Sequence, residues 1–430
     1  MNDILHHLRA DHLAGRRGGL YAVCSAHRAV LEAAIELARD HDRPLLVEAT
    51  ANQVNQFGGY TGMPPSQFGS FLLSISAALG FPSENLMLGA DHLGPYAWRS
   101  EPAAAAMAKA AELARQCVRA GFTKIHLDTG FGCSDDPAPS LPPNVAVERA
   151  VALCRAAEAA SDQLPSGTPR PLYVIGTEVP LPGGALEDPE ALDVTRPEDV
   201  AEFVAQAESR FRKAGLYGAW ERVIGVIVQP GVEFGNASVA RYDPVKARTL
   251  SAFHQDLPGI MTYEIHSTDY QTADCLSRMV SDHFTLLKVG PCLTHAFREA
   301  VFALEEIEAE RLKSRRDAVP SDLRRVMEQL MLRHPVHWRS HYRGTEEECR
   351  RMRLSSRLDR IRRYWSYPEA QAALDRLHRN LAPSVPAELV ERHLAGQASI
   401  LSSGEPALAS FEIVRRRIRK ALEPYLEACH

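Results

Sequence analysis

Eight short apolar segments alternate with eight longer segments of helical periodicity before residue 317. The apolar segments span residues 20–26, 44–49, 86–90, 124–128, 172–176, 223–228, 261–266 and 284–289. The helical patterns follow them near 28–42, 66–80, 101–120, 144–160, 197–214, 244–255, 271–283 and 292–316. Apolar strands that alternate with helices indicate a parallel sheet covered by helices. Eight such units predict an α/β fold of the TIM (β/α)8 barrel type, with an open doubly wound sheet as the alternative.

The strand pattern stops near residue 318. We expect residues 1–318 to form the barrel and residues 319–430 to form a helical C-terminal extension packed on it. Residues 311–363 contain 16 Arg and Lys against 7 Asp and Glu. This excess is typical either of a solvated basic helix face or of arginines that attract a phosphorylated substrate.

Composition excludes several classes of protein. The 49 Lys and Arg nearly balance the 54 Asp and Glu, which argues against a nucleic-acid-binding protein. No run of about 18 apolar residues predicts a membrane span, and the first residues do not resemble a signal peptide. The eight cysteines never form a C-x-x-C pair, which favours a reduced, cytoplasmic protein.

Polar residues lie at the end of every predicted strand or in the loop after it, where the catalytic groups of TIM barrels lie. They are Ser25, His27, Glu48, Asn52, Asp91, His92, His126, Asp128, Thr177, Glu178, Gln229, Glu233, Glu264, His266, Asp269 and Lys288. Burying polar groups costs free energy unless they are satisfied, so this ring predicts a polar functional site. For Ser25, Asn52 and Thr177, helix capping or loop closure is an equal alternative.

The Asp91-His92 pair is the most specific of these signals. A histidine can bind a divalent metal, and an adjacent carboxylate can act as a base. With Glu178 and His266, which follow other strands, the pair would form an open metal site. A hydrogen-bonded polar core without a metal is the alternative.

Two glycine-containing loops and one lysine are further candidates for ligand binding. In residues 52–62 (NQVNQFGGYTG), amides suit sugar hydroxyls and glycines permit close backbone approach. No G-K-[ST] follows, which counts against a nucleotide site. Gly183 and Gly184 form either a phosphate-binding loop or an ordinary turn. Lys288 is a Schiff-base nucleophile, an anion anchor or an ion-pair partner, and a bound metal would favour the anchor role.

Seven segments in order resemble the GatZ/KbaZ-like family. They include VEATANQVNQFGGYTGMPPSQF (47–68), GADHLGPYAW (89–98) and YEIHSTDYQT (263–272), and the others are 122–128, 173–184, 220–234 and 282–300. The resemblance runs from about residue 15 to about 365, where LSSRLDRIRRYW departs from the family's L-S-Y-S-D-R-I-R-Y-Y-W. Members are named as non-catalytic subunits of class II tagatose-bisphosphate aldolase, as tagatose 6-phosphate kinases or as D-tagatose 6-phosphate 4-epimerases. The resemblance implies a TIM barrel.

A more distant similarity connects the chain with class II aldolases. Asp91-His92 resembles their catalytic aspartate and zinc-binding histidine, His266-Ser267 their late zinc histidine, and Lys288 their K-[IV]-N segment. Their middle zinc histidine falls near Gln229, where this chain has no histidine. The similarity implies a divalent metal, zinc before manganese or magnesium, and no nucleotide. The implied ligands are His92, His266, Glu178 and Gln229.

The same resemblance implies roles in retro-aldol chemistry. The C4 proton of a 2-ketose is not α to the carbonyl, so simple deprotonation cannot epimerise C4. Cleavage of the C3–C4 bond, assisted by a Lewis acid and a base, can. The expected catalytic residues are Asp91, Glu178, Asp128 and Asp269. The expected substrate-binding residues are Glu48, Asn52, Gln53, His126, Ser267, Lys288, Gly183, Gly184, Arg357 and Arg360.

The first functional hypothesis is a metal-dependent epimerase that interconverts D-tagatose 6-phosphate and D-fructose 6-phosphate. The alternatives are a non-catalytic subunit that stabilises class II tagatose-1,6-bisphosphate aldolase and an epimerase of a related ketose or keto-uronate. A kinase is disfavoured because no nucleotide motif is present. The expected partners are a phosphorylated ketose, an aldolase subunit and a second copy of the chain, without nucleic acid or membrane.

Overall fold

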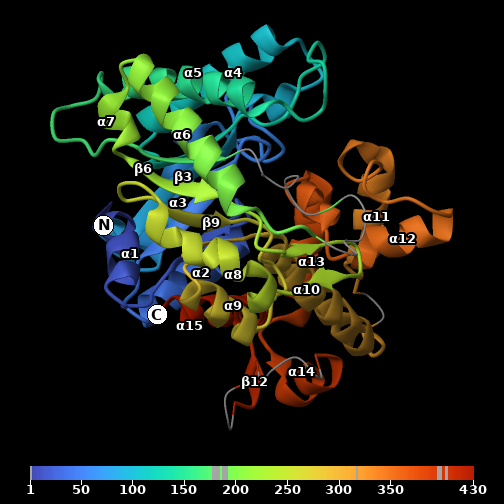
Figure 1. Cartoon of the computed structure of the whole chain (residues 1–430). Helices are drawn as coiled ribbons and strands as arrows, with labels where there is room; N and C mark the ends of the chain where they lie inside the picture. The colour runs from blue at the N-terminus through green and yellow to red at the C-terminus, as the bar shows by residue number, and fades with distance from the viewer. Residues whose placement is uncertain (1, 177–184, 186–191, 316–317, 395–399, 402–404) are drawn as a thin grey trace.

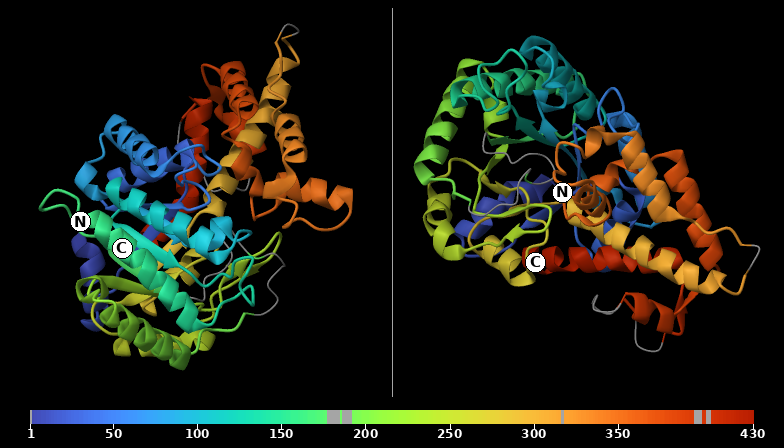
Figure 2. Two further views of the ribbon diagram at one scale, coloured as in Figure 1. Left: turned by 90° about the horizontal axis from the view of Figure 1, so that it is seen from above. Right: turned by 90° about the vertical axis from the view of Figure 1, so that its right-hand side faces the viewer.

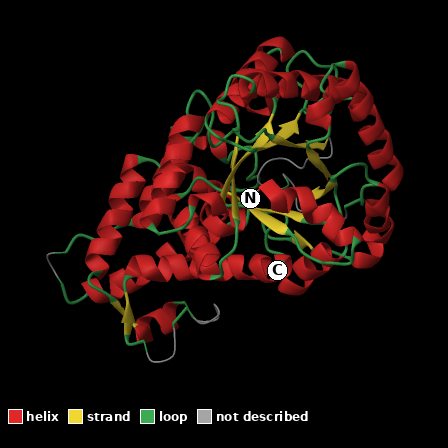
Figure 3. Ribbon diagram, turned by 90° about the vertical axis from the view of Figure 1, so that its left-hand side faces the viewer, coloured by secondary structure: helices red, strands yellow, loops and turns green. Residues whose placement is uncertain are grey.

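The fold is a closed barrel of eight parallel strands. The computed structural model describes residues 2–176, 185, 192–315, 318–394, 400–401 and 405–430. The barrel strands are β1 (Leu20–Cys24), β2 (Leu45–Thr50), β3 (Leu86–Leu93), β4 (Lys124–Asp128), β5 (Leu172–Gly176), β6 (Val223–Ile227), β9 (Thr262–Ile265) and β10 (Leu286–Val289). The pairing of β10 with β1 closes the ring, which lies inside a layer of helices (Figure 3). The predicted TIM barrel is confirmed, and an open sheet is excluded.

The barrel strands are each followed by a helix at the predicted place (Figure 1). These helices are α2 (Arg28–Asp40), α3 (Pro65–Ala78), α4 (Ala103–Arg119), α5 (Pro143–Ser161), α6 (Pro197–Lys213), α8 (Pro244–Phe253), α9 (Ala273–Ser281) and α10 (Pro291–Leu312). Five of them begin with proline, which fits the first turn because its missing N–H needs no helical partner. The shorter elements are η1 (Ser83–Asn85), η2 (Pro95–Trp98), α7 (Tyr217–Trp220), the hairpin of β7 (Glu233–Phe234) and β8 (Val239–Ala240), and η3 (His254–Asp256).

The barrel interior changes from apolar to charged along the strands. The N-terminal helix α1 (Asn2–Leu13) contributes Leu5 to an apolar cluster that includes Leu46 of β2. Glu48 lies two residues after Leu46 in β2, and Lys288 lies two residues after Leu286 in β10. Both leucines are buried. Alternate side chains of a strand share a face. The charged groups therefore lie inside the barrel, between the apolar layer and the C-terminal mouth.

The C-terminal segment is helical, as expected. It contains α11 (Leu323–Arg333), η4 (Pro335–His337), α12 (Glu346–Ser355), η5 (Arg360–Tyr364), α13 (Pro368–Leu381), the hairpin of β11 (Val385–Pro386) and β12 (Ala407–Leu408) with α14 (Ala387–His393) between its strands, and α15 (Ser410–Cys429). Helices α11 to α13 lie beside the barrel (Figures 1 and 2). The last helix, α15, returns to pack on α2, α9 and α10. The proposed division of the chain near residue 318 stays a prediction.

Two further expectations concern cysteines and membranes. All eight cysteines are free thiols, which agrees with the absence of a disulfide pattern in the sequence. Among the described residues, no helix is both long and apolar enough to cross a membrane.

Three histidines meet at the N-terminal end of the barrel. Nδ1 of His12 lies 2.9 Å from Nδ1 of His283, and the ring of His254 stacks on His283 with centroids 4.7 Å apart. Burial, followed by His283 and His12, lowers the pKa of His254 to about 3. The folded protein therefore binds fewer protons than the unfolded chain between about pH 3 and the ordinary histidine pKa of about 6.5.

We expect this histidine cluster to make the fold acid-sensitive. The contribution of His254 is complete above the unfolded pKa and decreases as the pH falls, by about 2 kcal/mol between pH 7 and pH 5. Urea unfolding of wild-type and His254→Gln protein at both pH values measures this difference. The variant should lose less stability on acidification than the wild type, whereas His41→Gln, at an exposed position, should behave like the wild type. Equal losses in all three proteins would contradict the assignment.

Candidate active site

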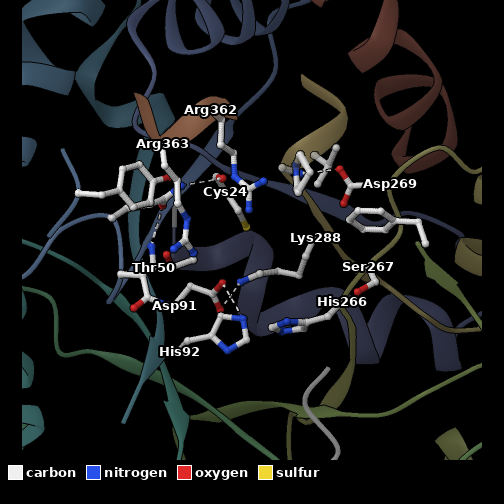
Figure 4. Close-up of a pocket in the computed structure, with 17 residues that line it drawn as sticks. Cys24, Thr50, Asp91, His92, His266, Ser267, Asp269, Lys288, Arg362 and Arg363 are labelled. Carbon is white, nitrogen blue, oxygen red and sulfur yellow. Dashed lines mark hydrogen bonds and ion pairs between the residues drawn. The ribbon is translucent and has the colours of Figure 1, made fainter. Parts of the chain in front are cut away.

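A pocket of about 610 Å³, a volume that includes its open mouth, lies at the C-terminal ends of the strands. Several expected site residues line it, as Figure 4 shows for those it labels. They are Asn52, Gln53, Asp91, His92, His266, Ser267, Asp269 and Lys288. Residues from four different strand ends and their loops thus converge at the position where TIM barrels carry their active sites.

A buried network of charges lies on and beneath the floor of the pocket. Nζ of Lys124 contacts Oε1 of Glu48 at 2.7 Å and Oε2 of Glu264 at 2.6 Å. Nζ of Lys288 contacts the other oxygen of Glu48 and lies 2.9 Å from Oδ1 of Asp91. Both oxygens of Glu48 are therefore paired inside the barrel. Glu48, expected to bind substrate, instead orients the two lysines.

Three histidines surround Asp91 above this network. The ring centroids of His92, His126 and His266 lie 5.0 to 5.2 Å apart. Nδ1 of His126 is 2.8 Å from Oδ1 of Asp91, and Nδ1 of His92 is 2.7 Å from Oδ2 of Asp128. His126 comes from β4, and its side chain is fully buried. It supplies a third histidine to the cluster, although the sequence predicts a role for it in substrate binding.

The charged neighbours decide the protonation of this cluster. Burial alone would raise the pKa of Asp91, but the histidines around it hold that pKa well below its usual range. Burial likewise opposes the charge on His92, yet Asp91 and Asp128 raise its pKa to about 9. Burial lowers the pKa of Lys288 to about 8. Asp91 is therefore ionised at neutral pH.

The donor set of the cluster fits a divalent metal. One ligand atom from each of Asp91, His126, Glu264 and His266 lies within 4.8 Å of the others. Nε2 of His126 is buried without a hydrogen-bond partner, as expected for an atom that coordinates an ion. The four buried carboxylates here (Glu48, Asp91, Asp128 and Glu264) outnumber the three buried positive groups (Lys124, Lys288 and His92), so a bound cation would offset the remaining negative charge.

The geometry changes the expected ligand set. Oε1 of Gln229 accepts hydrogen bonds from the backbone N–H groups of Gly231 and Val232, at 2.8 and 2.7 Å. That amide holds its own turn, and Gln229 does not line the pocket. His92, whose Nδ1 is paired with Asp128, lies beside the cluster. Of the other expected site residues, Glu178, Gly183 and Gly184 lie outside the described residues.

Two arginines do not lie where they are expected, whereas Asp269 does. Asp269, expected to be catalytic, lines the pocket, and its Oδ1 accepts hydrogen bonds from the N–H groups of Gly290 and Cys292, at 3.1 and 2.8 Å, at the start of α10. Its catalytic role stays a prediction. Arg360 is buried, and its Nε donates to the carbonyl of His337. Arg357 donates to a backbone carbonyl and lies over the ring of Tyr270. Neither of these two arginines lines the pocket.

Two arginines for which the sequence predicted no role line the pocket. They are Arg362 and Arg363, on the 3-10 helix η5. Both lie in the motif RLDRIRRYW, which also contains the expected Arg357 and Arg360. Which of its arginines face the barrel depends on how η5 turns, and a segment of five residues has too little periodicity to reveal that.

The glycine-containing loop folds over the side of the pocket. Gly59 has a φ of 57°, and a Cβ there would lie 2.3 Å from the carbonyl oxygen of Gln53, so the loop requires glycine at this position. Oδ1 of Asn55 accepts from the N–H groups of Phe57 and Gly59. The amide of Asn55 thus stabilises the loop itself, whereas Asn52 and Gln53 reach the pocket.

Comparison with known proteins places the chain in a family. The sequence model described as "D-tagatose-1,6-bisphosphate aldolase subunit GatZ/KbaZ-like" matches residues 5–430. The chain belongs to the GatZ/KbaZ-like family. The resemblance seen in its motifs is confirmed, and the match includes the C-terminal helices as well as the barrel.

Two relatives of this GatZ/KbaZ-like chain cover almost its whole length. The D-tagatose-1,6-bisphosphate aldolase subunit GatZ of Klebsiella pneumoniae is 44% identical over 434 residues, covering 100% of this chain and 99% of the relative. A crystal structure from Sinorhizobium meliloti, described as a probable tagatose 6 phosphate kinase, is 42% identical with a TM-score of 0.86. It covers 96% of this chain and 100% of that protein.

Proposed function

We propose that this chain is a metal-dependent epimerase that interconverts D-tagatose 6-phosphate and D-fructose 6-phosphate at C4. The observation that carries the proposal is the buried cluster of Asp91, His126, Glu264 and His266 at the floor of an open pocket. So many desolvated polar groups at one barrel mouth cost free energy. A purely structural subunit has no need for such an arrangement.

The proposed reaction is retro-aldol cleavage followed by aldol recapture. Asp91, which is ionised and lines the pocket, accepts the proton of the C4 hydroxyl. The C3–C4 bond breaks, its electron pair stays with C3, and C4 becomes an aldehyde. Rotation of the aldehyde fragment presents its other face to C3, and Asp91 returns the proton when the bond forms again. A divalent metal held by the cluster would supply Lewis-acid stabilisation of negative charge on the ketose oxygens.

A second candidate function is supported by the name of a relative. The Klebsiella pneumoniae protein is described as a subunit of D-tagatose-1,6-bisphosphate aldolase, so this chain is also a candidate partner of a class II aldolase. In this alternative the chain would keep the pocket but would not convert a substrate in it. It would instead raise the activity or stability of a catalytic subunit.

The purified chain alone distinguishes the two candidates. We expect it to convert D-tagatose 6-phosphate into fructose 6-phosphate, measured by a coupled assay, and to lose this activity in a chelator because the cluster would be emptied. Re-addition of zinc, manganese or magnesium should restore the rate and identify the metal. No conversion under any of these conditions would contradict the epimerase and favour the subunit. Co-purification with a class II aldolase would then be the next measurement.

A further inference from the structure

Two arginine side chains enter the pocket from the C-terminal segment. Arg362 and Arg363 follow each other on η5 and point toward the floor that carries Asp91 and Lys288 (Figure 4). The guanidinium of Arg363 lies over the ring of Tyr60, 5.2 Å from its centroid. The pair therefore joins the C-terminal segment to the loop that borders the other side of the pocket.

Neither guanidinium of this pair forms an ion pair with a carboxylate of the described residues. Arg362 donates to the backbone carbonyls of Leu358 and Asp359. Burial raises the pKa of Asp269, and the charge of Arg362 acts on that carboxyl only through space, in the opposite direction. Nε of Arg363 is buried without a hydrogen-bond partner. The acidic residue of the same segment, Asp359, is already occupied. Its Oδ1 accepts from Arg298 at 2.7 Å and its Oδ2 from Thr294 at 2.6 Å.

Neighbouring groups show the positive potential of this region. Burial, followed by the nearby arginines, lowers the pKa of His337 to about 4 and that of His341 to about 3. Both histidines are therefore neutral, and Arg360 adds a third guanidinium to the segment. An anion bound in the pocket would relieve this repulsion.

The other groups that could hold an anion are already in use. Lys288 contacts Glu48 and Asp91. The N-terminus of α10, a frequent anion site in barrels, is capped by the carboxylate of Asp269. Among the described lining residues, the arginine pair is the cationic group that remains for a ligand.

We infer that Arg362 and Arg363 bind the 6-phosphate of the substrate and retain the cleaved fragment, an inference that rests on the proposed epimerase. Cleavage of D-tagatose 6-phosphate between C3 and C4 leaves the phosphate on the aldehyde, glyceraldehyde 3-phosphate, and the other product is dihydroxyacetone. The aldehyde must rotate without leaving. Two guanidinium groups on its phosphate hold it by charge-assisted hydrogen bonds while the C4 end turns.

The inference explains why the C-terminal segment reaches the barrel mouth. The buried ion pair between Arg298 of α10 and Asp359 fastens η5 to the barrel, and both side chains are almost fully buried. Arg298 and Asp359 are thus positioning residues for the arginine pair.

The test uses Arg362→Gln and Arg363→Gln, with Arg351→Gln as the control. Arg351 is an exposed residue of α12, so its replacement removes the same charge from the same segment. Calorimetric titration with inorganic phosphate should show on the order of 10-fold weaker binding for each pocket variant and no change for the control. Thermal unfolding verifies that each variant is folded.

A second measurement detects release of the cleaved aldehyde fragment. The pocket variants should release glyceraldehyde 3-phosphate, detected with its dehydrogenase, at a larger fraction of total turnover than the wild type. Unchanged phosphate binding in both variants would overturn the inference, and so would an unchanged released fraction. If the wild-type chain has no epimerase activity, the proposed function fails and fragment retention fails with it. Loss of phosphate binding in the variants would even then support an anion site at the arginine pair.

Discussion

Replacement of His266 by alanine is expected to remove both metal binding and turnover. His266 follows β9, and its Nε2 lies 3.1 Å from Oε1 of Glu264 at the centre of the cluster. The variant loses one of the four donors and keeps a single histidine in the cluster, so we expect zinc affinity to fall by about 100-fold. Equilibrium dialysis with zinc and the coupled assay measure the two effects independently.

Comparison of histidine variants distinguishes the ligand set of the structure from that implied by the sequence. His126→Ala should weaken metal binding as strongly as His266→Ala, because the unpartnered Nε2 of His126 belongs to the cluster. His92→Ala should have a smaller effect on metal affinity, since Nδ1 of His92 is engaged by Asp128. His41→Ala, at an exposed position, is the control. Full zinc content and rate in His266→Ala would refute the metal site.

The Lys124→Met variant is expected to lose about 3–5 kcal/mol of unfolding free energy. Lys124 is fully buried and bridges Glu48 and Glu264, with contacts of 2.7 and 2.6 Å. Methionine fills a similar volume but removes the ammonium group that both carboxylates contact inside the barrel. Urea unfolding at neutral pH measures the loss.

A surface ion pair provides the matched control for Lys124. Nζ of Lys109 lies 2.6 Å from Oε1 of Glu101, but both side chains are about one-third exposed. Because water and ions screen such a pair, Lys109→Met should cost no more than about 1 kcal/mol. A loss in Lys124→Met as small as that of the control would show that the buried network does not stabilise the barrel.

Much of the site was predictable because strand ends are readable in sequence. Asp91, His266 and Lys288 each terminate or follow an apolar run, and parallel strands in a barrel bring such positions to one mouth. The roles within the site were less predictable. Glu48 and His126 have the same sequence signature as pocket residues, yet both are fully buried, because their place depends on barrel layer and register.

The pattern of apolar runs and helices by itself determined an α/β fold with parallel strands covered by helices, since continuously apolar strands that alternate with amphipathic helices have few other ways to bury both faces of the sheet. It also indicated that polar side chains gather at the C-terminal end of the barrel. Only the tertiary structure decided which partners meet: Lys124 with Glu48 and Glu264, and the arginines of η5 with a pocket built from the first 300 residues. These contacts join positions far apart in the chain, and their geometry depends on strand register and helix packing that no local pattern encodes.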